Sequence, residues 1–269
     1  MTSDGGPPDP TTSTTPLRGG PAGRHASSVL APNPGPMTLE GTNTWVLRGP
    51  GATDAAVVDP GPAGVPGHLA AARDVAGGEV ALTLLTHHHL DHTGAVPAWT
   101  ALTGSPARGA GHGAPWRDGE RIAVAGVVVE VLVTPGHTAD SVCFLLDDGV
   151  LLTGDTVLGR GTTVVPWPDG DLGAYLASLD RLVDLARAGR VVSLAPAHGP
   201  VVDEPLRHLT TLRDHRQQRL AQVRAAVAAG ARGAEEVRAA VYGDLAAELS
   251  RAADMSVRAQ LAYLGEPLD

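Results

Sequence analysis

The chain has few of the residues that cross-link a fold or carry positive charge. Cys143 is the single cysteine among 269 residues, so no internal disulfide can form and a reducing compartment fits the sequence. Lysine is absent, and arginine supplies every basic side chain. With 29 acidic residues against 20 basic ones, the formal net charge is −9. This balance argues against a protein that coats nucleic acid in general, but it leaves room for a local basic patch.

Long apolar runs are also missing. The best candidate for a membrane span, residues 122–133, is interrupted by Glu130 and is not long enough to cross a bilayer. Residues 1–28 are rich in Pro, Gly, Thr and Ser, and they lack the hydrophobic segment of a secretory signal. We therefore predict a disordered tail over residues 1–28 and a cytoplasmic protein, which argues against a periplasmic antibiotic-resistance enzyme.

The sequence does contain a regular succession of short apolar segments. Apolar residues make up 43% of the chain, which is enough to bury a core. Up to residue 204, short strands with interspersed helices predict an α/β fold in which helices pack on sheets. The predicted strands are residues 44–47, 55–58, 80–85, 121–124, 127–133, 142–146, 150–152 and 191–194, and the predicted helices are residues 65–75, 94–102 and 172–188.

Beyond residue 204 the sequence becomes helical and rich in arginine. Four helices are expected in a small helical appendage, with almost no strand-forming residues between them. Its first helix carries five arginines against the single acidic residue Asp214. This local excess permits contact with a phosphate backbone, although a solvated helix face explains it as well. The predicted helices are residues 205–229, 234–242, 246–253 and 257–264, and the five arginines are Arg207, Arg213, Arg216, Arg219 and Arg224.

Histidines crowd together directly after the apolar run of residues 80–85. Four histidines and one aspartate occupy six positions, where the strand is expected to open into a loop. Imidazole is the commonest nitrogen ligand of zinc, and carboxylate oxygen is the usual partner when a site also handles water. We expect a metal to be bound by this loop and the side chain of His88 to point away from it. The candidate ligands are His87, His89, Asp91 and His92.

Three further strand exits each carry a residue of the same ligand types. They are His137, Asp155 and His198, and because each follows an apolar run, their side chains are predicted to meet at one edge of the sheet. Seven ligands exceed what one tetrahedral zinc ion uses, so two Zn²⁺ ions with a bridging carboxylate fit better. One ion is assigned His87, His89 and His137, the other is assigned Asp91, His92 and His198, and Asp155 lies between them.

These seven residues follow the order of a known signature, His-x-His-x-Asp-His followed by a distant His, Asp and His. The chain therefore resembles the metallo-β-lactamase superfamily. Within it, residues 33–44, 159–164 and 197–201 resemble segments of the β-lactamase-like protein 2 group. The resemblance implies an αββα sandwich over residues 29–204 with a dinuclear zinc site at one edge. It also implies a C-terminal winged-helix-like domain over residues 205–269.

The resemblance further implies hydrolysis by a metal-bound hydroxide. Members of the group include a single-strand RNA endonuclease, and near relatives include acyl-carrier thioesterases and glyoxalase II-like enzymes. Two zinc ions can clamp the attacking and leaving oxygens and lower the pKa of bound water toward about 7. Asp91 is expected to ligate one metal, orient the hydroxide and take its proton. Thr42, Asn43 and Trp167 are candidates for contact with substrate, and for each a purely structural role is the alternative.

Several functions therefore stay open. Cleavage of single-stranded RNA is favoured by the resemblance and the helical tail, whereas the negative net charge favours a thioester or other small ester. A third hypothesis is an iron persulfide dioxygenase on the same fold, with one iron and an incomplete second site. The presence of Asp91, His92 and His198 argues against it. A fourth, a nucleic-acid-binding module without catalysis, conflicts with the intact ligand set.

Overall fold

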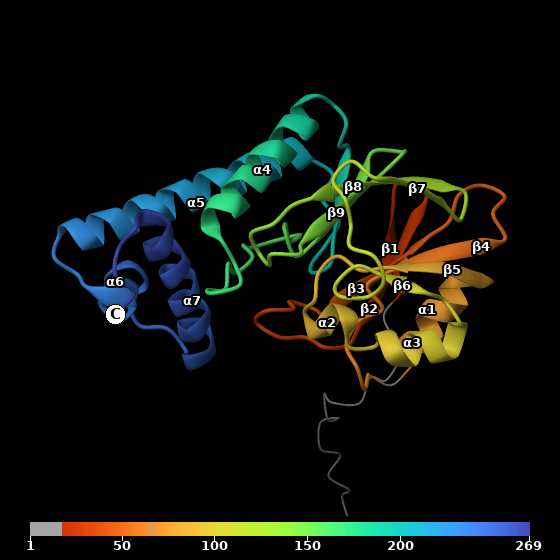
Figure 1. The fold of residues 1–269 in the computed structure, drawn as a ribbon, viewed down its shortest axis with the longest axis horizontal. Coiled ribbons are helices and arrows are strands. Elements are labelled where there is room, and N and C mark those ends of the chain that lie inside the picture. Colours follow the sequence, from red (N-terminus) through yellow and green to blue (C-terminus); the bar gives the residue numbers. More distant parts are fainter. Residues whose placement is uncertain (1–17, 66) are drawn as a thin grey trace, which may run out of the picture.

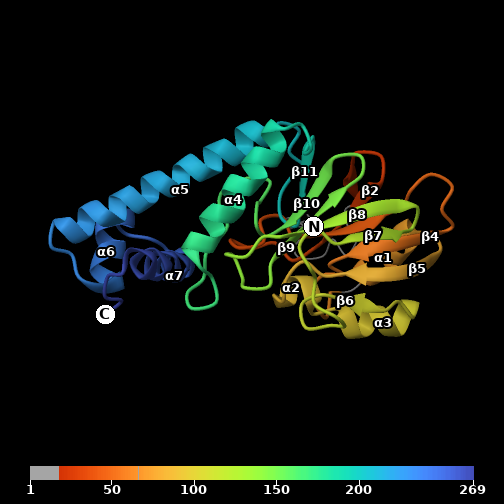
Figure 2. The same ribbon diagram turned by 45° about the horizontal axis from the view of Figure 1, so that its top comes forward.

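Two β-sheets stack face to face in the computed structural model, which describes residues 18–65 and 67–269 (Figures 1 and 2). In order across the first sheet, the strands are β1 (Arg18–Ala22), β2 (Ala26–Ala31), β3 (Thr42–Leu47), β4 (Asp54–Val58), β5 (Glu79–Leu84) and β6 (Ala107–Arg108). In order across the second sheet, they are β11 (Ser193–Pro196), β10 (Val150–Gly154), β9 (Val142–Leu146), β8 (Val127–Val133) and β7 (Arg121–Val124).

Helices cover the outer face of each sheet. On the first sheet lie α1 (His68–Ala76) and α3 (Val96–Thr103), while the short α2 (Leu90–Thr93) stands at the sheet edge. On the second sheet lie α4 (Leu172–Arg187) and the start of α5 (Pro205–Ala228). The predicted αββα sandwich is thereby confirmed.

Strand β9 explains why the layers stack in this way. Its residues are buried on both faces, as the continuous apolar run predicts. Phe144 faces the core between the two sheets, whereas Cys143 and Leu145 face the helices α4 and α5. Burial raises the pKa of the Cys143 thiol to about 11, so the thiol is protonated and inert at neutral pH.

The carboxyl ends of four strands carry the chain to one edge of the sandwich. Strands β4 and β5 are parallel, and so are β10 and β11. Asp59 follows β4, and the histidine cluster follows β5. Asp155 follows β10, and His198 lies two residues beyond β11. The topology alone therefore concentrates metal-type ligands at this edge.

The prediction of a disordered tail over residues 1–28 was wrong for its last part. Residues 1–17 lie outside the described residues, but β1 and most of β2 fall within residues 18–28. Backbone pairing extends the first sheet here, and Ala22 and Ala26 are buried in the core between the sheets. The small residues allow a close approach, because a Cβ on Gly19 would lie 2.0 Å from Ser28 Oγ.

The C-terminal segment is helical, as predicted, but it does not form a wing. Helix α5 runs along α4 and carries α6 (Gly233–Tyr242) and α7 (Ala247–Leu264) away from the sheets (Figure 1). The two helices predicted at residues 246–253 and 257–264 are one helix, α7. No residue of 205–269, all of which are described, lies in a strand. None of the helices in the described residues is long and apolar enough to span a membrane.

Candidate metal centre

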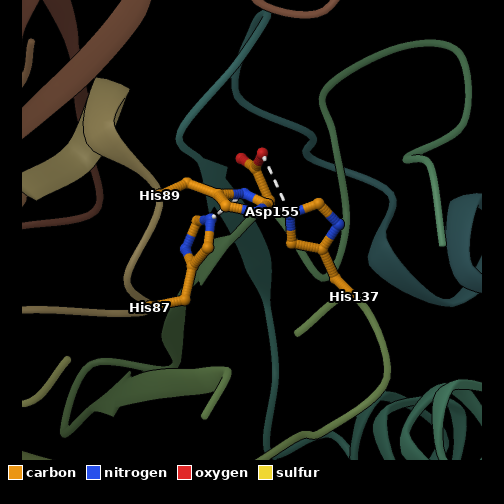
Figure 3. Close-up of side chains that lie close together, drawn as sticks. All are labelled: His87, His89, His137 and Asp155. Atoms are coloured by element: carbon orange, nitrogen blue, oxygen red, sulfur yellow. Dashed lines mark hydrogen bonds and ion pairs between the residues drawn. The ribbon is translucent and has the colours of Figure 1, made fainter. Parts of the chain in front are cut away.

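The first group of candidate ligands consists of His87, His89, His137 and Asp155, whose ligand atoms all lie within 4.8 Å of one another (Figure 3). The Nδ1 atom of His89 is 3.1 Å from Nε2 of His87 and 3.0 Å from Nε2 of His137. A ring nitrogen has either one proton or one lone pair, so Nδ1 of His89 cannot satisfy both neighbours by hydrogen bonding. A cation among these nitrogens would satisfy all three.

The second group consists of Asp91, His92 and His198. Nε2 of His198 lies 3.1 Å from Oδ2 of Asp91 and 3.2 Å from Oδ1 of Asp155, and Nε2 of His92 lies 3.4 and 3.5 Å from the same two oxygens. These two nitrogens and Oδ1 of Asp155 are buried, yet none of them makes a hydrogen bond to another described residue. Buried polar atoms without partners are costly, and imidazole and carboxylate are the donor types that zinc prefers. The donor set therefore fits a metal ion.

Asp155 connects the two groups. Its Oδ1 faces the second group, while its Oδ2 lies 3.7 Å from Nε2 of His137 in the first. All seven residues predicted from the sequence thus meet at one edge of the sandwich, in the two sets predicted. The chemistry of the donors and their spacing suit two ions that share one carboxylate.

Four of the five histidines among the seven candidate ligands are oriented by an oxygen on the far side of the ring, and for His87 this is the Thr86 hydroxyl. The Nδ1 atom of His137 donates to the carbonyl of Val164 at 2.7 Å, and that of His198 donates to the carbonyl of Gly41 at 3.0 Å. His92 donates to Oδ2 of Asp59 at 2.8 Å. Such contacts leave Nε2 facing the centre and fix the ring orientation.

Asp59 is a supporting residue that sequence reasoning missed. It is buried, and its carboxylate accepts hydrogen bonds from His92 and from both the backbone and the hydroxyl of Thr86. The Thr86 hydroxyl donates to Asp59, so it accepts the Nδ1–H of His87, 3.0 Å away. One carboxylate therefore orients a histidine in each group. The segment 59–62, Asp-Pro-Gly-Pro, has the composition of a turn, and its aspartate at the end of a predicted strand was the available signal.

Glycines precede two of the ligands for steric reasons. Gly136, before His137, has φ +135°, and a Cβ there would lie 2.3 Å from the Cα of Tyr175 in α4. Gly154, before Asp155, has φ +49°, and its Cβ would lie 2.8 Å from the Cβ of Thr86. Both loops can pass this close to their neighbours because the residue has no side chain.

The two groups differ in their electrostatics. In the first, burial lowers the pKa of His87 well below 6.5, and burial together with the charge of His137 lowers that of His89 to about 4. In the second, burial would lower the pKa of His198, but the negative charge of Asp155 outweighs it and raises the pKa to about 10. Asp155 and Asp91 likewise outweigh burial and raise the pKa of His92. The histidines of the first group are thus neutral at pH 7, whereas those of the second are protonated.

The aspartates of the centre are ionised for a related reason. Burial would raise the pKa of Asp91, but the positive charge of His92 outweighs burial and holds this pKa well below its usual range. The charges of His198 and His92 do the same for Asp155. Both carboxylates are therefore charged at neutral pH and available as ligands or proton acceptors.

The remaining predicted residues lie around this centre. His88 points away from both groups, as expected, and its Nδ1 lies 2.9 Å from Oδ1 of Asp140. Thr42 is fully buried and hydrogen-bonded to Asn33, so its place favours the structural alternative. Asn43 donates to the carbonyls of residues 196 and 199 and so holds the loop that carries His198. Trp167 is partly exposed, and its contact with substrate stays a prediction.

The arginines of α5 do not form an unpaired basic patch. Arg216 is buried against α4, and Arg219 stacks over the ring of Tyr242. Arg207 pairs with Glu204, and Arg213 pairs with Asp214. Four of the five arginines thus have partners inside the protein, which weakens the sequence argument for a phosphate-binding helix.

Comparison with known proteins gives consistent matches. The family model described as Metallo-beta-lactamase superfamily matches residues 37–115 and 101–193. An atrochrysone carboxyl ACP thioesterase of Aspergillus fumigatus is 35% identical over 249 residues, with 82% of this chain and 75% of that protein covered. A beta-lactamase-like protein 2 homolog of Drosophila melanogaster is 33% identical over 217 residues, with 72% of this chain and 71% of that protein covered.

A solved structure extends the match to the helical segment. The crystal structure of a metallo-beta-lactamase family protein from Thermus thermophilus is 26% identical and aligns with a TM-score of 0.73. The alignment covers 90% of this chain and 93% of that chain. Because residues 205–269 make up almost a quarter of the chain, coverage of this extent includes a large part of them.

Proposed function

Because this chain belongs to the metallo-beta-lactamase superfamily and is a metal-dependent hydrolase, we propose that it hydrolyses thioesters with two zinc ions held by the seven clustered residues. His87, His89 and His137 would hold one ion and Asp91, His92 and His198 the other, with Asp155 lying between the two groups. The observation that carries the proposal is the complete donor set in two groups joined by one carboxylate.

The protein's own residues prepare the site for this reaction. When bound, zinc supplies Lewis acidity that activates water and neutralises charge on the group under attack. The neutral imidazoles of the first group offer lone pairs without losing protons, as their lowered pKa values indicate. The carbonyls of Val164 and Gly41 and the carboxylate of Asp59 hold the rings in place, so the donor geometry exists before substrate arrives.

Asp91 is the residue we assign to proton transfer. Its side chain is 27% exposed, against 10% for Asp155 and none for His92 and His198, so it is the member of its group that water reaches most easily. The neighbouring positive charge keeps it ionised. A carboxylate in this position can orient the attacking water and accept its proton.

Three features favour a thioester over RNA. The thioesterase of A. fumigatus is similar over 82% of this chain. A hollow of about 800 Å³ beside β3 offers room for an acyl group. Leu30, Trp45 and Val201 form part of its lining, and Gly199, next to His198, lines it as well. The carboxylates of Asp140 and Asp169 flank His88, and negative charge beside the cluster disfavours a polyanion.

RNA cleavage is the second candidate, because the β-lactamase-like protein 2 group that the sequence resembles includes a single-strand RNA endonuclease. A beta-lactamase-like protein 2 homolog of D. melanogaster is similar over 72% of this chain. A paired assay separates the two activities. Zinc-loaded protein is incubated with acyl-pantetheine and acyl-carrier-protein thioesters, followed by thiol release, and with a labelled single-stranded RNA oligonucleotide, followed on gels. Zinc and iron are measured on the same sample. RNA cleavage without thiol release would refute the thioester proposal, and one iron without zinc would refute the zinc assignment.

The role of Asp91 is tested with the variant Asp91→Asn. The amide keeps the shape of the side chain but cannot accept a proton from water, so thioester turnover should fall by about 10²–10⁴-fold. The circular dichroism spectrum should stay close to that of the unmodified protein, and turnover is compared at zinc concentrations that fill both sites, because Asp91 is also assigned as a ligand. Full turnover in this variant would contradict the role assigned to Asp91.

A further inference from the structure

Helix α5 contacts both ends of a loop that borders the metal centre. This loop, residues 158–164, connects the turn after Asp155 to the residues that hold His137, and it has no helix or strand. At one end, Nε2 of His208 donates to the carbonyl of Leu158 at 2.9 Å. At the other end, Nη2 of Arg216 donates to the carbonyl of Thr163. The C-terminal helical segment thus reaches the centre through this loop.

Arg216 is an unusual residue for this position. It is only 8% exposed, and among the described residues no carboxylate forms an ion pair with it. Its guanidinium lies 5.1 Å from the ring centre of Tyr175, and the Tyr175 hydroxyl donates to the carbonyl of Thr156 at 2.9 Å. Burying a positive charge without a counter-charge raises the free energy of the folded state. The hydrogen bond to the Thr163 carbonyl and the contact with the Tyr175 ring must offset this increase.

The far side of the loop holds a candidate ligand. The carbonyl of Val164 accepts the Nδ1–H of His137 at 2.7 Å, and the hydroxyl of Thr163 lies 3.3 Å from the same nitrogen. Among the described residues, the hydrogen bonds of residues 162–164 are those with Arg216 and His137. Any shift of this backbone would therefore move the carbonyl that orients His137.

We propose that Arg216 is a positioning residue that couples the C-terminal helical segment to the first group of ligands. It anchors the carbonyl of Thr163, the anchored backbone presents the carbonyl of Val164, and that carbonyl fixes His137 with Nε2 toward the metal. The inference rests on the proposed metal centre. Part of the centre's affinity for zinc then depends on α5, a helix that contributes no ligand.

The effect is expected to be confined to the first group. The histidines of the second group are oriented elsewhere, His92 by Asp59 and His198 by the carbonyl of Gly41. Neither support involves residues 162–164. The bond from the loop to the second group, from the Gly159 amide to the carbonyl of His198 at 2.9 Å, lies at the other end of the loop, which His208 holds. Loss of Arg216 should therefore weaken the metal bound with His137 and leave the other unchanged.

The test places Arg216→Gln in two backgrounds of the full-length protein. His198→Ala damages the second group and leaves the first complete, while His137→Ala does the reverse. Zinc affinity is measured by competition with a chromophoric chelator. In the His198→Ala background, Arg216→Gln should lower zinc affinity about tenfold. This is the lower end of the loss in metal affinity that follows mutation of residues supporting a ligand. In the His137→Ala background it should have no effect, because the residue through which it acts is gone.

Arg219→Gln is the matched control. Arg219 lies one turn further along α5, stacks over Tyr242 at 4.5 Å and donates to Gln222 at 2.9 Å, but it does not contact the 158–164 loop. It should leave zinc affinity unchanged in both backgrounds. Hydrogen exchange of the metal-free proteins gives a second measurement, in which the peptide containing residues 158–164 should exchange faster in Arg216→Gln than in Arg219→Gln.

Defined outcomes would overturn the proposal. Unchanged zinc affinity in the His198→Ala background, equal weakening in both backgrounds, or equal weakening by Arg219→Gln would each refute it. If Arg216→Gln does not fold, Arg216→Lys takes its place, because a lysine keeps a donor for Thr163. Arg216→Lys should weaken zinc binding by less than tenfold, and only in the His198→Ala background. Equal loss of zinc affinity in both backgrounds would refute the coupling. Absence of zinc binding by the unmodified protein would refute the proposed function, and the inference with it.

Discussion

Replacing Asp59 by asparagine should weaken zinc binding in the second group although Asp59 is not a ligand. The carboxylate accepts three hydrogen bonds, from His92 Nδ1 at 2.8 Å, from the Thr86 hydroxyl at 2.6 Å and from the Thr86 amide at 2.9 Å. An amide has only one oxygen. If that oxygen stays with the Thr86 amide, the new NH₂ group faces His92, and both groups would then be donors.

His92 can relieve this conflict by changing tautomer. Its Nδ1 would then accept from the amide, and the proton would sit on Nε2, which faces Asp91 and Asp155. Zinc bound at Nε2 would force the ring proton back onto Nδ1, where it meets the amide donor and not a carboxylate oxygen, so zinc affinity at the second group should fall by about 10–100-fold. Loss of an acceptor for a buried donor should also lower the free energy of unfolding by about 1–3 kcal/mol.

Chelator competition and chemical unfolding of the same protein measure the two effects. Asp54→Asn, at the opposite end of β4, is the control and should change neither quantity much, because Asp54 lies at the start of the strand, away from the cluster. Two zinc ions bound by Asp59→Asn with the affinities of the unmodified protein would refute the reasoning. Stronger weakening in the first group than in the second would refute the role given to the His92 contact.

Two pH effects should accompany these results. Zinc binding to the second group at pH 7 should release protons, because His198 has a pKa of about 10 without metal and the pKa of His92 is also raised. Binding to the first group should release almost none, because the pKa of His87 is lowered. Calorimetry in buffers of different ionisation enthalpy counts the released protons, and equal release from both groups would contradict the assignment. Burial lowers the pKa of His68 from 6.5 to about 4, so the stability due to its neutral form is present above pH 6.5 and is lost as pH falls toward 4. The free energy of unfolding of the metal-free protein, measured with urea, should therefore fall between pH 7 and pH 5. The fall should be smaller by about 2 kcal/mol in His68→Gln than in the unmodified protein, and an equal fall in both would argue against this cause.

The sequence predicted best those elements whose pattern has one physical interpretation. Strands β7, β8 and β9 begin and end at the predicted residues, because β-branched runs between turns favour a strand strongly. The seven candidate ligands were predictable for a related reason. Each is a metal-binding residue type directly after an apolar run, and strand ends meet at one edge of a sheet.

The features that were missed depend on the tertiary structure. Strand β1 consists of Arg-Gly-Gly-Pro-Ala, which has the composition of a loop and becomes a strand because β2 offers its edge. Asp59 lies in a segment whose Asp-Pro-Gly sequence also suits a surface turn. Its role depends on Thr86 and His92, which are 27 and 33 residues further along the chain. Local sequence contains no information on such partners.

Arg216 differs from these cases, because the helical period of α5 does mark it. The buried positions of this helix include Leu209, Leu212, Leu220 and Val223, and Arg216 falls between Leu212 and Leu220 at the same three- to four-residue spacing. A charged residue on an apolar stripe is buried unless the helix is displaced, and a buried arginine needs an acceptor. Counting the five arginines together hid this distinction between one core position and four others. The phase of a charged residue within the helix, and not the net charge of the helix, therefore indicates where to search for a contact with the site.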